Sequence, residues 1–466
     1  MKVKFLGGTQ NVTGSKFLLE ISGRRLMIDC GLFQEREFKD RNWKPFPINP
    51  SSIDAIILTH AHIDHCGYLP KIVSDGFKGD IFCTEPTAEI VKIALLDAGK
   101  LQEEDASKKR ARHLAEGRTP PYPVIPLYTA EDAKSVSPLF KTYPYEQPFE
   151  PFDDVSVSFH DAGHILGSAM IKIKAGKENA KTLIFSGDIG RWDKAILKDP
   201  SIFQEADIVF VESTYGNKNH DGGSEAAGEE LANIINQTVQ RNGNIIIPTF
   251  AIERAQELIY FLSKFLKDNV IPHILVFVDS PMAIDVTEIF NKYPEYLDTK
   301  PEELIKKGAS PFDFPLLKLT RSVDESKSIN HITGSIAVMA GSGMCTGGRI
   351  KHHLITNISR EESTVVFVGY QAKGTLGRHI LSKPERVRIL GREYPVKAEI
   401  RNINGFSAHA DKSELLRWLS GFITPPKKIF VIHGEEEVSQ EFAEVLRQKM
   451  PGSEIIIPEY LSEHNI

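Results

Sequence analysis

The spacing of apolar residues divides the chain into three stretches that predict different kinds of structure. Between 224 and 368, apolar strands alternate with amphipathic helices, which is typical of a parallel sheet covered by helices. Short strands return after about residue 380, before a predicted helix at 412–418 and a strand at 428–432. In the first stretch, short apolar segments separated by polar loops predict strands at 2–6, 16–21, 25–28, 53–58, 155–159, 170–174, 182–185 and 208–211.

This order predicts two domains, the first of which is discontinuous. A chain of 466 residues is too long for one ordinary hydrophobic core. If the late strands complete the first domain, the middle stretch must be an insertion that leaves and re-enters it. We therefore expect a first domain formed by residues 1–212 and 378–466, with an inserted α/β domain at 213–377.

The strand predicted at 53–58 runs directly into a cluster of potential metal ligands. Within six positions the sequence places His60, His62, Asp64 and His65. Imidazole nitrogens and carboxylate oxygens are the ligands that zinc prefers outside all-thiolate sites, whereas structural zinc sites favour cysteine. The cluster therefore predicts a catalytic metal with an open coordination position.

Other predicted strands also lead into residues that suit a metal site. The loops after them contain His164 in DAGH and Asp188 in SGD, and the strand at 208–211 leads to Glu212. Because successive strand ends present such groups, we expect one sheet system to direct its loops to a single site.

Composition indicates the class of protein and the cellular compartment to expect. The chain is 41% hydrophobic and 25% charged, as in ordinary globular proteins. No run approaches the roughly 20 apolar residues of a membrane span, and residues 1–10 lack the apolar core of a signal peptide. The four cysteines are scattered without C-x-x-C spacing, which indicates reduced thiols. We therefore expect a cytoplasmic protein that does not enter a membrane.

The charge distribution leaves nucleic-acid binding open. The net charge of −6 argues weakly against it but does not exclude a local basic groove. The predicted helix at 85–118 contains a basic run at Lys108, Lys109, Arg110, Arg112 and His113. This run is either a solvated helix face or a basic stripe that faces substrate.

The strand-end motifs resemble, in order, the four motifs of the metallo-β-lactamase superfamily. They are Asp29 in IDCG, residues 60–65 in HAHIDH, His164 in DAGHILGS and Asp188 in SGDIG. The resemblance implies an α/β fold of the αββα type, in which two sheets pack face to face between layers of helices.

Three further motifs resemble those of the β-CASP branch of this superfamily. They are Glu212 in ESTYG, His379 in GTLGRHI and His409 in GFSAHAD. This branch includes the endonuclease subunit of the eukaryotic pre-mRNA 3′-end cleavage complex, its archaeal homologues and RNase J. The match covers nearly the whole chain and implies that the middle stretch is an inserted β-CASP domain.

The resemblance also implies two zinc ions per chain. Asp29 resembles a group that orients a ligand by hydrogen bonding. The family's ligands correspond to His60, His62 and His164 for the first metal, Asp64, His65 and His409 for the second, and Asp188 between them.

The implied activity is that of a zinc-dependent ribonuclease. It would hydrolyse RNA phosphodiester bonds to 5′-phosphate and 3′-hydroxyl ends, in RNA processing or decay. Asp29, Asp64 and Asp188 would support catalysis at the metals. His379 is the expected general acid for the leaving oxygen, with Glu212 fixing its ring. Endonuclease and 5′→3′ exonuclease activity are both compatible with the sequence.

The expected partner is single-stranded RNA, and the resemblance also suggests a homodimer. His409 favours RNA, because DNA-acting members usually carry an apolar residue at that motif. The glycine-rich loop at 341–349 is compatible with phosphate binding at a helix N-terminus, although such loops are common. Stacking on an aromatic ring is a common way to bind a base. With the resemblance added, the candidate RNA contacts are Phe250, Arg254, Ser342, Thr346 and Arg349.

Two other functions compete with this interpretation. A small-molecule metallo-hydrolase of the same superfamily, such as a thioesterase-like enzyme, would not need Glu212, His379 or an inserted domain. A non-catalytic RNA-binding scaffold would have lost metal ligands, and this sequence has lost none of those expected.

Overall fold

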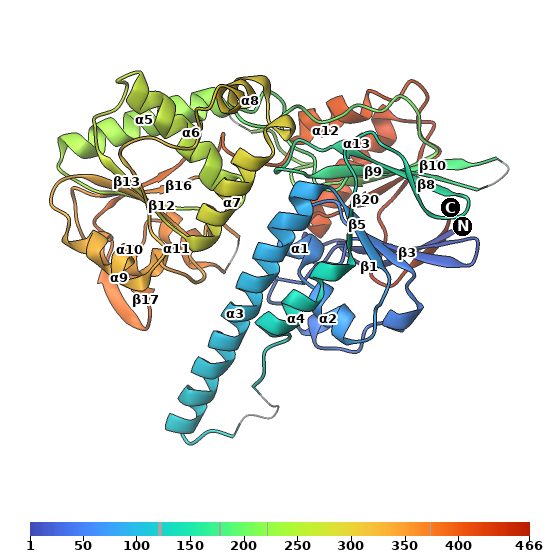
Figure 1. The fold of residues 1–466 in the computed structure, drawn as a ribbon, viewed down its shortest axis with the longest axis horizontal. Helices are drawn as coiled ribbons and strands as arrows, with labels where there is room; N and C mark the ends of the chain where they lie inside the picture. Colours follow the sequence, from blue (N-terminus) through green and yellow to red (C-terminus); the bar gives the residue numbers. More distant parts are fainter. Residues whose placement is uncertain (120–123, 177–178, 221, 373) are drawn as a thin grey trace. The chain divides into compact units, whose positions relative to one another are not determined.

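The computed structural model describes residues 1–119, 124–176, 179–220, 222–372 and 374–466 (Figure 1). The chain forms two compact units. The first contains Met1–Trp192, Asp199–Asn219 and His409–Ile466, and the second contains Asp193–Lys198 and His220–Ala408. The chain therefore passes between the units four times.

The first unit contains two seven-stranded sheets. The first sheet has the order β22-β1-β2-β3-β4-β5-β6 and the second has the order β21-β20-β11-β10-β9-β8-β7. The strands of the first sheet are β1 (Lys2–Gly7), β2 (Lys16–Ile21), β3 (Arg24–Ile28), β4 (Ala55–Ile57), β5 (Asp80–Cys83), β6 (Phe140–Thr142) and β22 (Glu463–Asn465). Those of the second are β7 (Phe149–Phe152), β8 (Val155–Asp161), β9 (Ala169–Ala175), β10 (Lys181–Phe185), β11 (Ile208–Glu212), β20 (Lys428–Ile432) and β21 (Glu454–Ile456).

Aromatic side chains fill the space between these two sheets. Phe185 and Phe210 stack with ring centroids 3.9 Å apart, and Phe210 stacks on Phe430 at 4.9 Å. From the first sheet, Phe5 contacts Phe430 at 5.2 Å. All four rings are fully buried, so this aromatic core joins early and late parts of the chain.

Helices cover the second sheet on its other face. There Val209 and Val211 pack with Trp418 and Phe442, which lie on α12 (Lys412–Leu419) and α13 (Glu436–Lys449). The strands of the first sheet are connected by α1 (Ile63–Cys66), α2 (Leu69–Ser74), α3 (Glu85–Ala115) and α4 (Ala130–Ser135). None of the helices in the described ranges is both long and apolar enough to cross a membrane.

The second unit is built on a six-stranded sheet with the order β14-β13-β15-β12-β16-β19. Every pair in it is parallel. Its strands are β12 (Ile245–Pro248), β13 (Leu275–Asp279), β14 (Leu317–Leu319), β15 (Ile336–Ala340), β16 (Thr364–Phe367) and β19 (Glu399–Asn402). Its helices are α5 (Ser224–Gln240), α6 (Arg254–Lys267), α7 (Pro281–Lys292), α8 (Thr299–Lys306), α9 (Val323–Ser328), α10 (Ile350–Asn357) and α11 (Leu376–Leu381). The predicted fold class, with two sandwiched sheets and a parallel-sheet domain, is confirmed.

The ends of the second unit differ from the expected domain limits of 213 and 377. The unit continues to Ala408 because β19 pairs with β16 at the edge of the sheet. The hairpin of β17 (Arg386–Ile389) and β18 (Arg392–Pro395) also packs into the core of this unit through Val387 and Ile389. The residues at 378–408 therefore belong with the parallel sheet.

A short excursion of the chain at Asp193–Lys198 is anchored in the second unit by a buried ion cluster. Lys194 Nζ lies 2.6 Å from Glu257 Oε1 and 3.6 Å from Glu253 Oε1. Arg254 also pairs with both carboxylates, and all four side chains are at least nine-tenths buried. Burial opposes charge on Glu257, but Lys194 and Arg254 outweigh it and hold the pKa of that carboxyl below its ordinary value.

Lys194→Ala tests this anchor. Because the substitution leaves buried carboxylates with one fewer cation, the free energy of unfolding should fall by about 3–5 kcal/mol. Urea unfolding followed by far-UV circular dichroism measures the loss. Lys198→Ala, on the same excursion but exposed, is the control and should change stability by less than about 0.5 kcal/mol. Equal losses in both variants would contradict the role of the cluster.

Candidate metal centre

The loops at the ends of the first unit's strands bring the predicted metal residues together. The loop after β4 carries His60 and His62, and α1 carries Asp64 and His65. His164, Asp188 and His433 follow β8, β10 and β20, and Glu212 is the last residue of β11. Both sheets of the sandwich therefore contribute to one site.

Four residues form the first possible metal site. One ligand atom from each of His60, His62, His164 and Asp188 lies within 4.8 Å of all the others. His62 Nδ1 is 3.0 Å from His60 Nε2 and 3.1 Å from His164 Nε2. Such convergence of ring nitrogens fits a shared cation.

The protonation states in this group also suit metal binding. Burial, together with the neighbouring His65, lowers the pKa of His60 to about 3. Burial likewise lowers the pKa of His62 to about 4 and that of His164 well below its ordinary value. Because these imidazoles are neutral at pH 7, their lone pairs are available to a metal ion.

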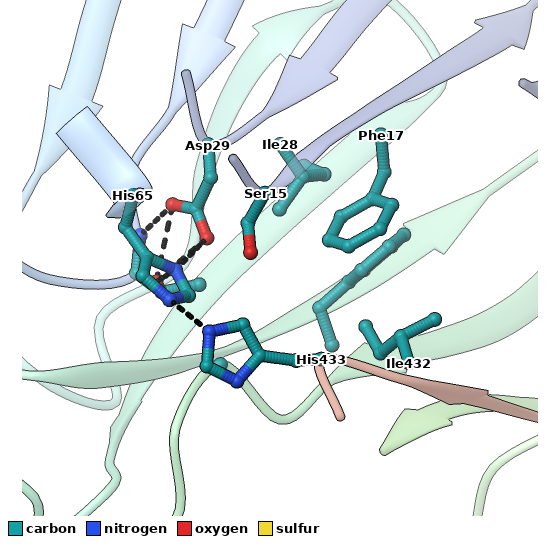
Figure 2. Close-up of a pocket in the computed structure, with 10 residues that line it drawn as sticks. Ser15, Phe17, Ile28, Asp29, His65, Ile432 and His433 are labelled. Carbon is teal, nitrogen blue, oxygen red and sulfur yellow. Dashed lines mark hydrogen bonds and ion pairs between the residues drawn. The ribbon is translucent and has the colours of Figure 1, made fainter. Parts of the chain in front are cut away.

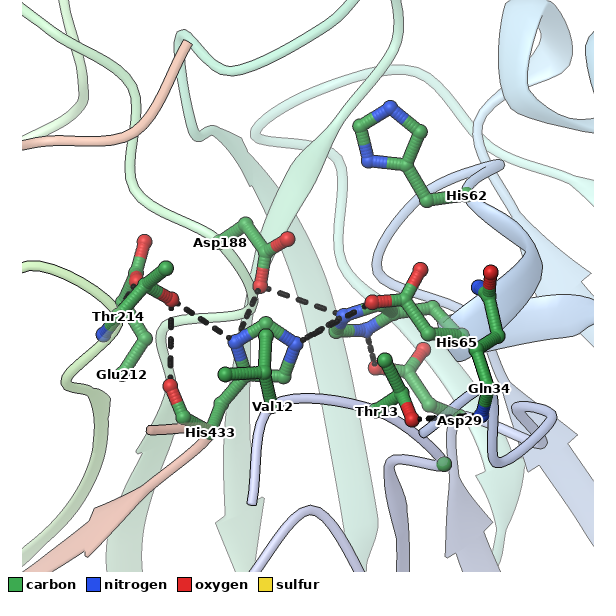
Figure 3. Close-up of polar contacts among 12 residues, drawn as sticks. Val12, Thr13, Asp29, Gln34, His62, His65, Asp188, Glu212, Thr214 and His433 are labelled. Atoms are coloured by element: carbon green, nitrogen blue, oxygen red, sulfur yellow. Dashed lines mark hydrogen bonds and ion pairs between the residues drawn. The ribbon is translucent and has the colours of Figure 1, made fainter. Parts of the chain in front are cut away.

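A second possible metal site is formed by Asp64, His65 and His433; the two histidines are labelled in Figure 3. His65 Nε2 and His433 Nε2 are 3.0 Å apart, and His433 Nε2 is 3.6 Å from Asp64 Oδ2. The sequence analysis expected His409 in this group, and the structure places His433 there instead. A signal for His433 exists in the sequence, because the strand at 428–432 ends in His-Gly as the other site strands end in His or Asp.

Asp188 lies between the two groups. Its Oδ2 is 3.3 Å from His60 Nε2, and its Oδ1 is 3.3 Å from His65 Nε2 and 3.5 Å from His433 Nδ1. Oδ1 is buried and accepts no hydrogen bond from the described residues. A buried carboxylate oxygen is expected to have a partner, so this atom fits a metal between the groups.

Asp29 orients His65 from behind. Its Oδ2 is 2.7 Å from His65 Nδ1, and its Oδ1 accepts a hydrogen bond of 2.7 Å from the Thr59 backbone N–H. The contact with Nδ1 leaves His65 Nε2 free to bind a metal. Figure 2 shows Asp29 and His65 among the residues that line a small cavity. The cavity volume of about 10 Å³ has room for no more than one water molecule.

Backbone contacts tie both ends of the loop at 8–15 to the second group. Gly8 O accepts a hydrogen bond of 2.8 Å from His433 N, and Ser15 N donates one of 2.9 Å to Asp64 O. Gly31 packs so closely here that a Cβ would lie 1.5 Å from Asp64 O. The backbone therefore fixes Asp64 and His433 independently of any metal.

Glu212 pairs with His409 beside the metal groups. His409 Nδ1 is 3.3 Å from Glu212 Oε1 and 4.0 Å from Asp188 Oδ2. Glu212 is held in place because its two oxygens accept hydrogen bonds from the backbone N–H groups of Ile189 and Thr214. Burial opposes charge on His409, but Glu212, Asp188 and Asp64 raise its pKa to about 9.

His379, the predicted partner of Glu212, belongs to the second unit. It is an exposed residue of α11 in the second unit, whereas the imidazole against Glu212 belongs to His409. Two contacts that the sequence prediction gave to late histidines are therefore made by other histidines. His409 takes the contact expected of His379, and His433 takes the contacts expected of His409.

Three of the five predicted RNA contacts lie just beyond the carboxyl ends of two strands of the parallel sheet. Phe250 follows β12 and is 39% exposed. Ser342 and Thr346 follow β15, with their hydroxyl oxygens 3.1 Å apart. β12 and β15 are neighbours, and the chain order reverses between them, which is where parallel sheets bind ligands beyond the strand ends.

The two predicted arginine contacts serve the interior of the second unit. Arg254 belongs to the buried cluster with Glu253 and Glu257. Arg349 Nη1 donates to Asp279 Oδ1 at 2.6 Å, and the same guanidinium donates to the carbonyls of Thr320 and Arg321. Their donors are directed at buried carboxylates and backbone, so neither residue presents a free cation.

Comparisons with known proteins agree with this arrangement. Residues 18–210 match a metallo-β-lactamase superfamily domain, residues 255–380 a Beta-Casp domain and residues 393–458 a Zn-dependent metallo-hydrolase RNA specificity domain. Ribonuclease TTHA0252 of Thermus thermophilus is 36% identical over 437 residues, covering 94% of each chain. Transcription termination factor FttA of Methanocaldococcus jannaschii is 30% identical over 460 residues, covering 96% of this chain and 69% of the relative.

A solved structure shows the same fold at low sequence similarity. It is that of a protein of unknown function from Enterococcus faecalis, with a TM-score of 0.56, 12% identity and 99% of each chain covered. Together with the identity to the Thermus protein and the clustered His and Asp residues, these matches establish the family. The chain belongs to the β-CASP ribonuclease family of the metallo-β-lactamase superfamily, and it is a metal-dependent hydrolase.

Proposed function

We propose that this protein cleaves single-stranded RNA by hydrolysis of phosphodiester bonds, leaving 5′-phosphate and 3′-hydroxyl ends. The observation that carries this proposal is the Glu212–His409 pair beside two sets of metal ligands. A thioesterase-like enzyme has no need of a positioned imidazole acid at this point. The names of the bacterial and archaeal relatives, a ribonuclease and a transcription termination factor, both concern RNA.

Two zinc ions per chain are the proposed cofactors. His60, His62, His164 and Asp188 would hold one; Asp64, His65, His433 and the shared Asp188 would hold the other. A pair of zinc ions activates water and neutralises charge on the phosphate that is attacked. Asp29 keeps His65 in the tautomer that leaves Nε2 free for a metal.

His409 is the proposed general acid. Nδ1 faces Glu212, and we assign the other ring nitrogen, Nε2, the donation of a proton to the leaving 3′-oxygen. The raised pKa keeps the ring protonated at neutral pH. Glu212 therefore acts by positioning and charging the imidazole.

In the second unit, Phe250 and the loop of Ser342 and Thr346 are the proposed RNA contacts. A partly exposed phenyl ring can stack on a base, and the hydroxyls can bind a phosphate. Their position at the reversal of strand order supports this proposal. Arg254 and Arg349 instead stabilise the domain that presents these groups.

Metal removal tests the activity itself. With 5′- and 3′-labelled single-stranded RNA, chelation by EDTA should abolish cleavage and zinc should restore it, because the nucleophile depends on the metals. Internal fragments would indicate endonuclease activity and mononucleotides exonuclease activity. Thioester turnover without cleavage of RNA would overturn the proposal.

Single substitutions of the late histidines separate their roles. His433→Ala should lower bound zinc from about two ions per chain to about one, because a ligand of the second metal is lost. His409→Ala should keep the zinc but slow turnover about 10²–10⁴-fold, because the acid is lost. Inductively coupled plasma mass spectrometry measures the bound zinc, and cleavage of labelled RNA measures the turnover rate. His379→Ala is the comparison; if it alone loses turnover, His379 is the acid after all.

The pH dependence of kcat reports the charge on His409. An acid must be protonated, so the rate should fall as pH rises through its pKa, at or below about 9 because bound zinc repels the proton. Glu212→Gln removes the carboxylate charge and should move this alkaline limb down by about 1–3 pH units. The exposed Glu205→Gln is the control and should leave the limb in place. An unshifted limb in Glu212→Gln would contradict the pairing.

A further inference from the structure

The outer half of α3, which ends in a basic segment, has no role in the chemistry above. We infer that residues 100–118, here called the α3 arm, form a second RNA-binding surface that holds the phosphate backbone of the substrate. This inference rests on the proposed function, because RNA is the occupant. It adds a contact that neither the metal centre nor the parallel sheet supplies.

The two halves of α3 differ in burial. α3 has 31 residues, and the half up to Gly99 buries eight of them against the first unit. From 100 onward only Ala106 is buried, although the helix continues for about 24 Å. Figure 1 shows α3 continuing past α4. Helices gain most of their stability from packing. Packing therefore does not explain why the outer half of α3 extends beyond the core.

One face of the arm is already occupied by the returning chain. Leu127 N donates to Gln102 Oε1 at 3.0 Å, and Arg110 Nη1 donates to Val124 O at 2.9 Å. The opposite side carries Lys108 and Arg112, which lie one turn apart and are exposed. The free side of the arm therefore presents Lys108 and Arg112.

The net charge of residues 108–118, at the end of the α3 arm, is opposite in sign to that of the whole protein. Residues 108–118 contain five lysines and arginines and one glutamate, whereas the whole chain has a net charge of −6. Lys108 is paired with Glu104 at 3.0 Å. Among the residues that the structure describes, no carboxylate pairs with Lys109 or Arg112. Such cations complement the phosphates of a nucleic acid.

Other anionic partners fit the arm less well. Leu101 and Leu114 are the large apolar side chains that the arm exposes, too few to enter a membrane as an amphipathic helix does. Three acidic residues at 103–105 lie next to the basic end and would repel a broad anionic surface. A single RNA strand can follow the basic residues and avoid the acidic ones.

The geometry predicts that only long RNA uses the arm. The first turn of α3 is tied to the His164 loop, because Thr84 Oγ1 donates to Gly167 O at 2.6 Å. From Glu85 to Arg112 the helix extends about 40 Å. A short RNA held at the metals cannot span that distance, whereas a longer strand can bind both places.

The test compares Lys109→Glu/Arg112→Glu with Arg447→Glu/Lys449→Glu. The second variant makes the same charge change at the exposed end of α13 in the same unit. For the zinc-loaded enzyme on RNA of about 30 nucleotides, losing two phosphate contacts should raise KM roughly 20-fold at about 0.1 M salt and reduce the slope of log KM against log salt by about 1.4. The increase should be much smaller on RNA of about five nucleotides, and absent in the α13 variant.

The other possible results either refute the α3 arm as an RNA-binding surface or show that the proposed function fails independently of it. An unchanged KM on long RNA, or equal changes on both lengths, would refute the arm as a binding surface. Lys109→Gln/Arg112→Gln, which keeps helix propensity, should give a smaller increase in the same direction; no increase would count against it. If the wild type cleaves neither RNA, the proposed function fails, and fluorescence anisotropy with the long RNA then tests the arm. Loss of vesicle or acidic-peptide binding without loss of RNA binding would reject RNA as the partner.

Discussion

The structure of the first unit depends on one buried carboxylate shared by imidazoles from different loops. Asp188 is 2% exposed and faces His60 through one oxygen and His65 and His433 through the other. A buried charge is tolerated only with partners. The histidines hold the pKa of Asp188 well below its ordinary value despite burial, so the carboxylate stays ionised. The loops around it must therefore approach closely enough to surround one side chain.

Glycine makes that approach possible. A Cβ at Gly190 would lie 1.9 Å from Gly163 O, next to His164. A Cβ at Gly31 would lie 1.5 Å from Asp64 O. At both glycines, the backbone of the neighbouring loop thus occupies the position that a side chain would take. Larger residues at either position would push a metal ligand away from Asp188.

The insertion of the second unit is connected to the same site. Glu212 ends β11 shortly before the chain leaves at Asn219, and His409 is the first residue after the return. Ala410 N donates to Ile189 O at 2.7 Å beside Asp188, so the returning strand is fixed against the metal loop. The Glu212–His409 pair is thus formed by the two chain segments that flank the insertion. A change in the inserted second unit would affect Glu212 and His409 through these two segments.

Local sequence by itself determined the strands, the alternation of the parallel-sheet unit and the early cluster of ligands, because each depends on residues a few positions apart. It could not decide which late histidine binds metal. His379, His409 and His433 all lie in plausible motifs, and their roles depend on packing against residues some two to four hundred positions earlier. Nor could it show that Arg254 and Arg349 neutralise Glu257 and Asp279, because a buried carboxylate is visible only once the chain has folded around it. Tertiary structure decided which side chains each of these residues contacts, because contacts between distant parts of the chain depend on distance in space.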